Sequence, residues 1–85
     1  MNLEILTPEH KVFSGKVYGI QLPGTEGSFE LLENHAPIIA SLGKGKMKVL
    51  KDKNNHTETY EISGGFVEML HNTASVLIED ATAMS

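Results

Sequence analysis

The sequence predicts an all-β fold, a flattened antiparallel β-sandwich or barrel of about eight to ten short strands. Extended runs recur at intervals of about 8–12 residues, and a turn signal rich in Gly, Pro or Asn closes each run. No segment spaces its apolar residues at a helical period over three turns without such a signal intervening. A parallel sheet needs crossover connections, normally helices, so we expect the strands to pair antiparallel.

The first expected strand lies around Leu3 and Ile5. It ends at Thr7-Pro8, because proline cannot donate a hydrogen bond to a ladder. The second begins at Val12-Phe13 and is expected to turn at Ser14-Gly15, since serine and glycine are common turn residues.

The third expected strand, Val17 to Leu22, alternates with a period of two. Tyr18, Ile20 and Leu22 are therefore expected to share one face of the sheet. The loop Pro23 to Gly27 follows, in which the glycines can adopt positive φ.

The stretch SFELLENHAPIIASL places a polar turn between two apolar runs, Phe29–Leu32 and Ile38–Leu42. Pro37 restricts Ala36 to an extended conformation, and Asn34 is able to form an Asx turn. These residues predict a rigid, exposed corner between two buried strands. A stiff corner suits a docking surface because little entropy is lost on binding, while a plain turn remains the alternative.

The rest of the chain continues the pattern of short strands closed by turns. Within it, we expect Ile62 and Phe66 to be buried. In the lysine-rich run, Lys44, Lys46 and Lys48 are expected to mark one solvated face. No strand is expected after Glu79, and residues 1–85 are expected to form one domain. The remaining expected strands are Lys46–Leu50, Thr57–Ile62, Phe66–Leu70 and Ala74–Glu79, with turns at Gly43–Gly45, Asp52–His56, Ser63–Gly65 and His71–Thr73.

Composition excludes several classes of protein. The chain contains no cysteine, which excludes disulfides, a thiolate nucleophile and a cysteine-based zinc site. A net charge of −4 and the absence of Trp argue against a nucleic-acid partner. No signal peptide is apparent, and no apolar run approaches the roughly 20 residues that span a bilayer. Membrane association is therefore expected only through a partner.

The four histidines, His10, His35, His56 and His71, all lie in or beside expected turns. None has the spacing of a known metal motif, so surface histidines are favoured over a weak site built on Glu33 and His35. No serine lies in a G-x-S-x-G elbow, and a thin core rarely provides a desolvated pocket. We therefore expect no catalytic, cofactor-binding or metal-binding residues.

The order and spacing of several short motifs resemble the N-terminal domain of the epsilon subunit of rotary F-type ATP synthases. The resemblance covers nearly the whole chain, and it implies a flattened β-sandwich of about ten strands. The motifs are LEILTPE at 3–9, FSG at 13–15, QLPGTEGSF at 21–29, NHAPII at 34–39, ISGGFVE at 62–68 and VL at 76–77.

This resemblance implies a noncatalytic subunit of the central stalk, without a cofactor, that couples proton-driven rotation to ATP synthesis. It implies two partners, the gamma subunit and the ring of c subunits, at the cytoplasmic face of the bacterial inner membrane, and no homo-oligomer. The implied gamma contacts are Thr7, His35 and Ala40. The implied c-ring contacts are Glu26, Ser28 and Glu30.

The chain departs from the family pattern in two places. Glu30 stands where the family often has glycine, which changes the charge toward the ring. The resemblance places the start of the usual C-terminal helical hairpin at Asp80–Ser85, where the sequence ends, so no hairpin is expected within residues 1–85, whether this form is naturally short or trimmed. Inhibition of ATP hydrolysis and ATP binding, which belong to the hairpin, are therefore not expected.

Two rival interpretations belong to other classes of protein. A biotinyl- or lipoyl-type carrier domain is also a small β-sandwich with a lysine on a hairpin, and Lys46-Met47-Lys48 faintly resembles that motif. The acidic residue and the Ala or Met expected before the lysine are missing. A cupin-like metal enzyme is the third interpretation, and it would require stoichiometric metal.

Overall fold

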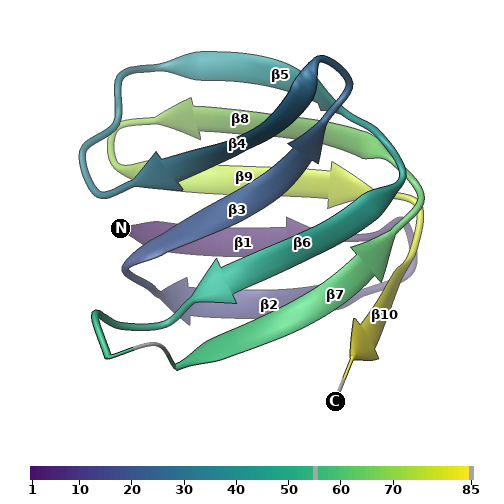
Figure 1. Cartoon of the computed structure of the whole chain (residues 1–85), viewed down its shortest axis with the longest axis horizontal. Coiled ribbons are helices and arrows are strands. Elements are labelled where there is room, and N and C mark those ends of the chain that lie inside the picture. Colours follow the sequence, from purple (N-terminus) through teal and green to yellow (C-terminus); the bar gives the residue numbers. More distant parts are fainter. Residues whose placement is uncertain (55, 85) are drawn as a thin grey trace.

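Alternating apolar residues form ten β-strands and no helix in residues 1–54 and 56–84, the part of the chain that the computed structural model describes (Figure 1). The predicted all-β class is confirmed. No helix in this described part is long and apolar enough to cross a membrane. Asn55, in the predicted Asp52–His56 turn, lies outside the described residues. The strands are β1 (Asn2–Leu6), β2 (Lys11–Lys16), β3 (Gly19–Gly24), β4 (Gly27–Leu32), β5 (Ile38–Leu42), β6 (Gly45–Leu50), β7 (Thr57–Ile62), β8 (Gly65–Leu70), β9 (Thr73–Ile78) and β10 (Ala81–Met84).

The ten strands form one continuous hydrogen-bonded sheet that folds over itself. Strands β4-β3-β6-β7-β10 make one layer, and strands β5-β8-β9-β1-β2 make the other (Figure 1). The layers are joined where Gly24 of β3 pairs with Leu42 of β5. This arrangement leaves each layer with one face toward the core and one toward solvent.

One strand pair contradicts the prediction of an entirely antiparallel sheet. β1 and β9 pair in parallel, with Leu3 opposite Ala74 and Ile5 opposite Val76. A parallel pair requires a long connection, but not necessarily a helical one. Here the seven intervening strands, β2 to β8, make the connection, so the absence of helices did not exclude a parallel pair.

The last strand was not predicted from the sequence. Residues Ala81–Met84 form β10, which pairs antiparallel with β7, for example Ala81 with Ile62. These four residues carry little alternation, since three of them are exposed. The free backbone edge of β7 therefore defines this strand, rather than its own apolar pattern.

The first half of the chain also differs in detail. Ser14-Gly15 was predicted as a turn but lies within β2, whereas the chain turns at Val17-Tyr18. There, the Val17 amide donates to the Met1 carbonyl and the Tyr18 amide donates to the Leu50 carbonyl. Val17 is consequently buried and Tyr18 is half-buried, so Tyr18 does not continue the inward face of Ile20 and Leu22 as predicted.

The core lies between the two layers and contains the inward residues of nearly every strand. Burying one Leu, Ile or Met side chain contributes about 1.5–3 kcal/mol relative to leaving it exposed. No polar or charged residue is buried among the described residues. The largest fully buried side chains are Leu3, Ile5, Ile20, Leu22, Leu31, Met47, Val49, Ile62, Val67, Met69 and Val76.

Ile62 is buried as predicted, but Phe66 is not. Phe66 begins an alternation in β8 in which Val67 and Met69 point inward, so Phe66 points outward and is 57% exposed. Ile39 likewise lies on the outer face of β5, in a strand predicted to be buried, and is 73% exposed. Hydrophobicity alone could not distinguish the two faces of these strands; their register determines which residues are inside.

Candidate partner-binding surfaces

The outer face of β5, β8 and β9 carries a group of exposed apolar side chains. We call this group the apolar face; its members are Ile39, Phe66, Leu70 and Leu77. Phe66 and Leu77 lie directly opposite each other in the antiparallel β8–β9 pair. Such a concentration of large exposed apolar side chains on one sheet face typically marks an interaction surface.

Two grooves adjoin the apolar face. A groove of about 440 Å³ lies at the end of β9. Its walls include Phe66 and Leu77 of the apolar face, together with Leu6, Thr7 and Pro8. At the other end of β8, a groove of about 340 Å³ is lined by Pro37, Ile39 and Leu70, among others. The apolar face therefore extends from the end of β1 to the turn that precedes β5.

Thr7, a predicted gamma contact, lies in a locked turn directly after β1. Its backbone amide donates to the His10 carbonyl at 2.9 Å, and its hydroxyl donates to the same carbonyl at 3.2 Å. The His10 amide donates back to the Thr7 hydroxyl oxygen at 3.2 Å. Thr7 is half-buried and lines the groove beside Phe66 and Leu77, so it borders the apolar face.

His35, the second predicted gamma contact, lies at the other end of the apolar face in the turn between β4 and β5. Its side chain is exposed, as predicted, and its Nδ1 donates to the Ala36 carbonyl at 2.7 Å, since a carbonyl only accepts. The His35 backbone amide donates to the Leu32 carbonyl at 3.1 Å. These two bonds fix both the backbone and the ring of His35.

The same turn is fixed on both sides by more distant parts of the chain. The Asn34 amide donates to the side-chain Oδ1 of Asn72 at 2.7 Å, although 38 positions separate the two residues. Asn34 itself has a φ of 63°, a left-handed conformation that asparagine tolerates. The Glu33 carboxylate accepts a 2.8 Å hydrogen bond from the Met1 ammonium, and this bond lowers the pKa of Glu33.

Ala40, the third predicted gamma contact, has a different orientation. It is half-buried and packs against the core, while its neighbours Ile39 and Ser41 are exposed. Ala40 pairs with Val67 of β8, so it lies within the same strands as the apolar face but on the inward side. Ile39, and not Ala40, is therefore the outward side chain in this part of β5.

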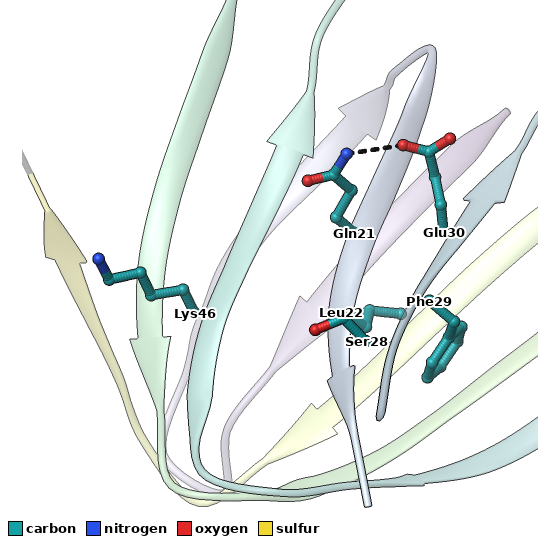
Figure 2. A pocket seen from close by; sticks show the side chains of 6 residues that line it. All are labelled: Gln21, Leu22, Ser28, Phe29, Glu30 and Lys46. Carbon is teal, nitrogen blue, oxygen red and sulfur yellow. Dashed lines mark hydrogen bonds between the residues drawn. The ribbon is translucent and has the colours of Figure 1, made fainter. Parts of the chain in front are cut away.

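The predicted c-ring contacts all lie on the β3–β4 hairpin. Glu26 is in the two-residue turn between Gly24 and Gly27, and Ser28 and Glu30 are on β4. All three side chains are exposed. Ser28 and Glu30 line a depression of about 490 Å³ on the outer face of the hairpin (Figure 2).

The depression contains charged and polar groups that sequence reasoning did not select. Gln21 of β3 lies opposite Glu30, and its side-chain Nε2 donates to Glu30 Oε2 at 2.7 Å (Figure 2). Lys46 of the neighbouring strand β6 also lines the depression. The alternation of Val17 to Leu22 predicted that Gln21 points to the face opposite Leu22. Its hydrogen bond to Glu30, however, depends on the pairing of β3 with β4.

Strand β5 connects the two surfaces. The Thr25 amide, in the hairpin turn, donates to the Ser41 carbonyl of β5 at 3.1 Å. The Gly43 amide donates to the Pro23 carbonyl at 2.7 Å, which ties the end of β5 to the end of β3. The hairpin that carries Glu26 is thus hydrogen-bonded to the strand that carries Ile39.

The remaining candidates in the sequence do not form a site in the described residues. His56 pairs with Asp52 at 2.6 Å within the β6–β7 loop, and the hydrogen bond from His56 lowers the pKa of Asp52. Among residues 1–54 and 56–84, no group of three or more His, Asp or Glu side chains is placed to hold a metal ion. Lys46 and Lys48 lie within β6 around the buried Met47, not on a hairpin turn as a carrier lysine requires.

Comparison with known sequences supports the resemblance. Residues 1–84 match the family described as ATP synthase, Delta/Epsilon chain, beta-sandwich domain. The ATP synthase epsilon chain of Chlorobium limicola is 40% identical over 81 residues, which are 94% of this chain and 90% of that protein. The ATP synthase epsilon chain of Salinibacter ruber is 38% identical over 86 residues, but this chain covers only 58% of its length.

Solved structures share the fold at lower sequence identity. A chain in the mitochondrial ATP synthase of Euglena gracilis, in a structure of OSCP, F1 and the c-ring, superposes with a TM-score of 0.88 at 20% identity. The match covers 95% of this chain and 51% of that one. A chain in the central stalk and c-ring of Tetrahymena thermophila mitochondrial ATP synthase gives 0.77, also at 20% identity, and covers 94% and 63%.

Proposed function

The chain belongs to the family of ATP synthase delta/epsilon chain β-sandwich domains, and on this premise we propose that it is a noncatalytic subunit of the central stalk. In this proposal it binds the gamma subunit and the ring of c subunits. It couples proton-driven rotation of the ring to ATP synthesis. It acts at the cytoplasmic face of the bacterial inner membrane and reaches the membrane only through the ring.

The gamma subunit is assigned to the apolar face. The single observation that carries the proposal is that Ile39, Phe66, Leu70 and Leu77 are exposed between the groove that Thr7 lines and the turn that holds His35. Thr7 therefore lines one groove of this surface, and His35 lies two residues before Pro37, which lines the other. Burial of exposed Phe and Leu side chains against a partner makes the free energy of binding more favourable, by about 25 cal/mol for each Å² of apolar surface removed from water.

The c ring is assigned to the β3–β4 hairpin. Glu26, Ser28 and Glu30 are exposed there, and Gln21 and Lys46 add an amide and an ammonium group to the same depression. These groups suit polar loops at the end of a membrane ring better than lipid, because charged side chains are not removed from water without a partner. The two surfaces thus differ in chemistry as their partners would.

Transmission of torque requires that the two surfaces do not move independently. Thr25 of the hairpin is hydrogen-bonded to Ser41 of β5, and β5 is paired along its length with β8. A force applied at the hairpin is therefore carried through sheet hydrogen bonds to the apolar face. Rigid surfaces also lose little conformational entropy when they bind.

The proposal is tested by recovery of partners on the affinity-tagged chain from detergent-solubilised bacterial membranes. Gamma and c subunits are expected to be recovered together with the unmodified chain. Phe66→Glu should abolish recovery of gamma, because it replaces the large exposed aromatic side chain of this face with a second carboxylate two residues from Glu68. Thr82→Lys, at an exposed position of β10 outside both surfaces and opposite Glu61, is the charged control and should leave the recovery of both subunits unchanged. Recovery of neither subunit with the unmodified chain would contradict the proposal.

A further inference from the structure

The turn that carries His35 is held by a residue that lies on another strand pair. β8 and β9 are joined by the two-residue turn His71-Asn72, since Leu70 pairs with Thr73. Both turn residues have positive φ, 50° for His71 and 58° for Asn72, as a type I′ turn requires. This turn brings the side chain of Asn72 to the loop between β4 and β5.

A single hydrogen bond, accepted by the side-chain oxygen of Asn72, joins the His71-Asn72 turn to the turn that carries His35. Asn72 Oδ1 accepts from the backbone amide of Asn34 at 2.7 Å, a short distance for a bond from a backbone amide. Asn72 is half-buried, and its own carbonyl accepts from the Asn2 amide at 3.0 Å. Its side chain is therefore supported by a backbone that is itself fixed to β1.

Asn34 is the residue directly before His35, and its left-handed backbone sets the direction in which His35 leaves β4. Without the acceptor on Asn72, the Asn34 amide would face solvent and the turn would lose its tie to β8 and β9. We propose that Asn72 is a positioning residue, whose Oδ1 holds the His35 turn in the conformation that binds the gamma subunit. This inference rests on the proposed function.

Two substitutions separate the acceptor from the turn conformation. Asn72→Gly keeps a residue that adopts positive φ without strain but removes the acceptor. Asn72→Asp keeps an oxygen acceptor at the same position and also tolerates the left-handed conformation. The two variants therefore differ in whether position 72 offers a side-chain acceptor to the Asn34 amide, and Asn72→Asp in addition carries a negative charge.

The first measurement is amide hydrogen exchange in the full chain, residue by residue, by NMR. In Asn72→Gly the Asn34 amide is expected to exchange about tenfold faster, whereas in Asn72→Asp it should exchange as in the unmodified chain. The core amides of β8 and β9 should be unchanged in both variants, because their ladder is intact. An unchanged exchange rate of the Asn34 amide in Asn72→Gly would overturn the proposal.

The second measurement is the dissociation constant for purified gamma subunit. Asn72→Gly is expected to bind about three- to tenfold more weakly, and Asn72→Asp within about twofold of the unmodified chain. Equal weakening in both variants, or none in Asn72→Gly, would overturn the positioning role. If the unmodified chain itself does not bind gamma, the proposed function fails, and with it the role in binding. The exchange measurement still decides whether the bond exists.

Discussion

The side-chain amide of Gln21 donates a 2.7 Å hydrogen bond to the carboxylate of Glu30 across the antiparallel β3–β4 pair. Directly opposed side chains on one face of a sheet restrict each other's rotamers, so this bond fixes the direction of the Glu30 charge. Glu30 is also one of the residues assigned to the contact with the c ring. Gln21 therefore holds the Glu30 carboxylate through an uncharged donor.

Reversal of this charge should affect one partner and not the other. Glu30→Lys is expected to reduce recovery of c subunits from membranes at least tenfold, a loss of about 1.4 kcal/mol, because a charge at a contact is replaced by its opposite. Recovery of gamma serves as the internal control and should not change. Equal loss of both subunits would instead indicate that the hairpin had been disrupted.

Truncation of two apolar residues, Ile62 and Phe66, should affect different properties: protein stability for the first and gamma binding for the second. Ile62→Ala removes a fully buried side chain and is expected to lower the free energy of unfolding by about 2–5 kcal/mol. Phe66→Ala removes an exposed side chain and should change stability by less than about 1 kcal/mol while weakening gamma binding by more than that. Urea denaturation and a gamma titration of both variants measure these effects; a large stability loss for Phe66→Ala would contradict its outward placement.

Gly65 should be the glycine least tolerant of a side chain. Its φ is 150°, and an added Cβ would overlap the Leu77 carbonyl oxygen and lie 2.9 Å from Ile78 Cγ2. Gly65→Ala is therefore expected to cost at least about 2 kcal/mol in the free energy of unfolding. Gly15→Ala is the control, since its Cβ would lie 3.7 Å from Phe13 in ordinary contact, and it should change stability by less than about 0.5 kcal/mol. Thermal or urea unfolding of the two variants decides between them.

Stability should fall in acid partly through Glu58. Hydrogen bonds from the Lys51 ammonium and then from the Tyr60 hydroxyl lower the pKa of the Glu58 carboxyl below its usual 4.5. A lowered pKa in the folded state stabilises the protein above pH 4.5, and this contribution is lost as the pH falls through the lowered pKa. Because the side chains of Lys51 and Glu58 are both partly exposed, Glu58→Gln should cost only about 0.2–1 kcal/mol at pH 7.

The measurement compares urea unfolding of Glu58→Gln and the unmodified chain at pH 7 and at several values below 4.5. The difference in the free energy of unfolding is expected to shrink as the pH falls. A difference that stays constant across this range would show that the carboxylate charge of Glu58 does not contribute to stability.

Local patterns were sufficient to predict most strands and turns of this fold. The run from Lys46 to Val49 alternates strictly, and the turn signals at His71-Asn72 and at Thr25-Glu26 lie where the chain reverses. What alternation does not determine is which strands become neighbours. The parallel pairing of β1 with β9, and the edge position of β10, depend on contacts between distant parts of the chain.

In the candidate surfaces, too, some features follow from local sequence patterns and others only from contacts between distant parts of the chain. The exposure of His35 and Glu26 follows from turn chemistry and was expected from the sequence. Phe66 was expected to be buried because it is large and apolar, and only the register of β8 with β9 brings it beside Leu77 on the outer face. The bond from Asn34 to Asn72 likewise joins residues 38 positions apart, which no local pattern reveals.

The binding of gamma to the apolar face is tested most directly by site-specific labelling. The chain contains no cysteine, so Ile39→Cys, Leu77→Cys and Thr82→Cys each introduce one reactive thiol. The rate of maleimide modification is measured by mass, with and without a saturating amount of purified gamma subunit. We expect gamma to slow modification at positions 39 and 77 about tenfold or more and to leave position 82 unchanged. Equal rates at all three positions with and without gamma would contradict the account.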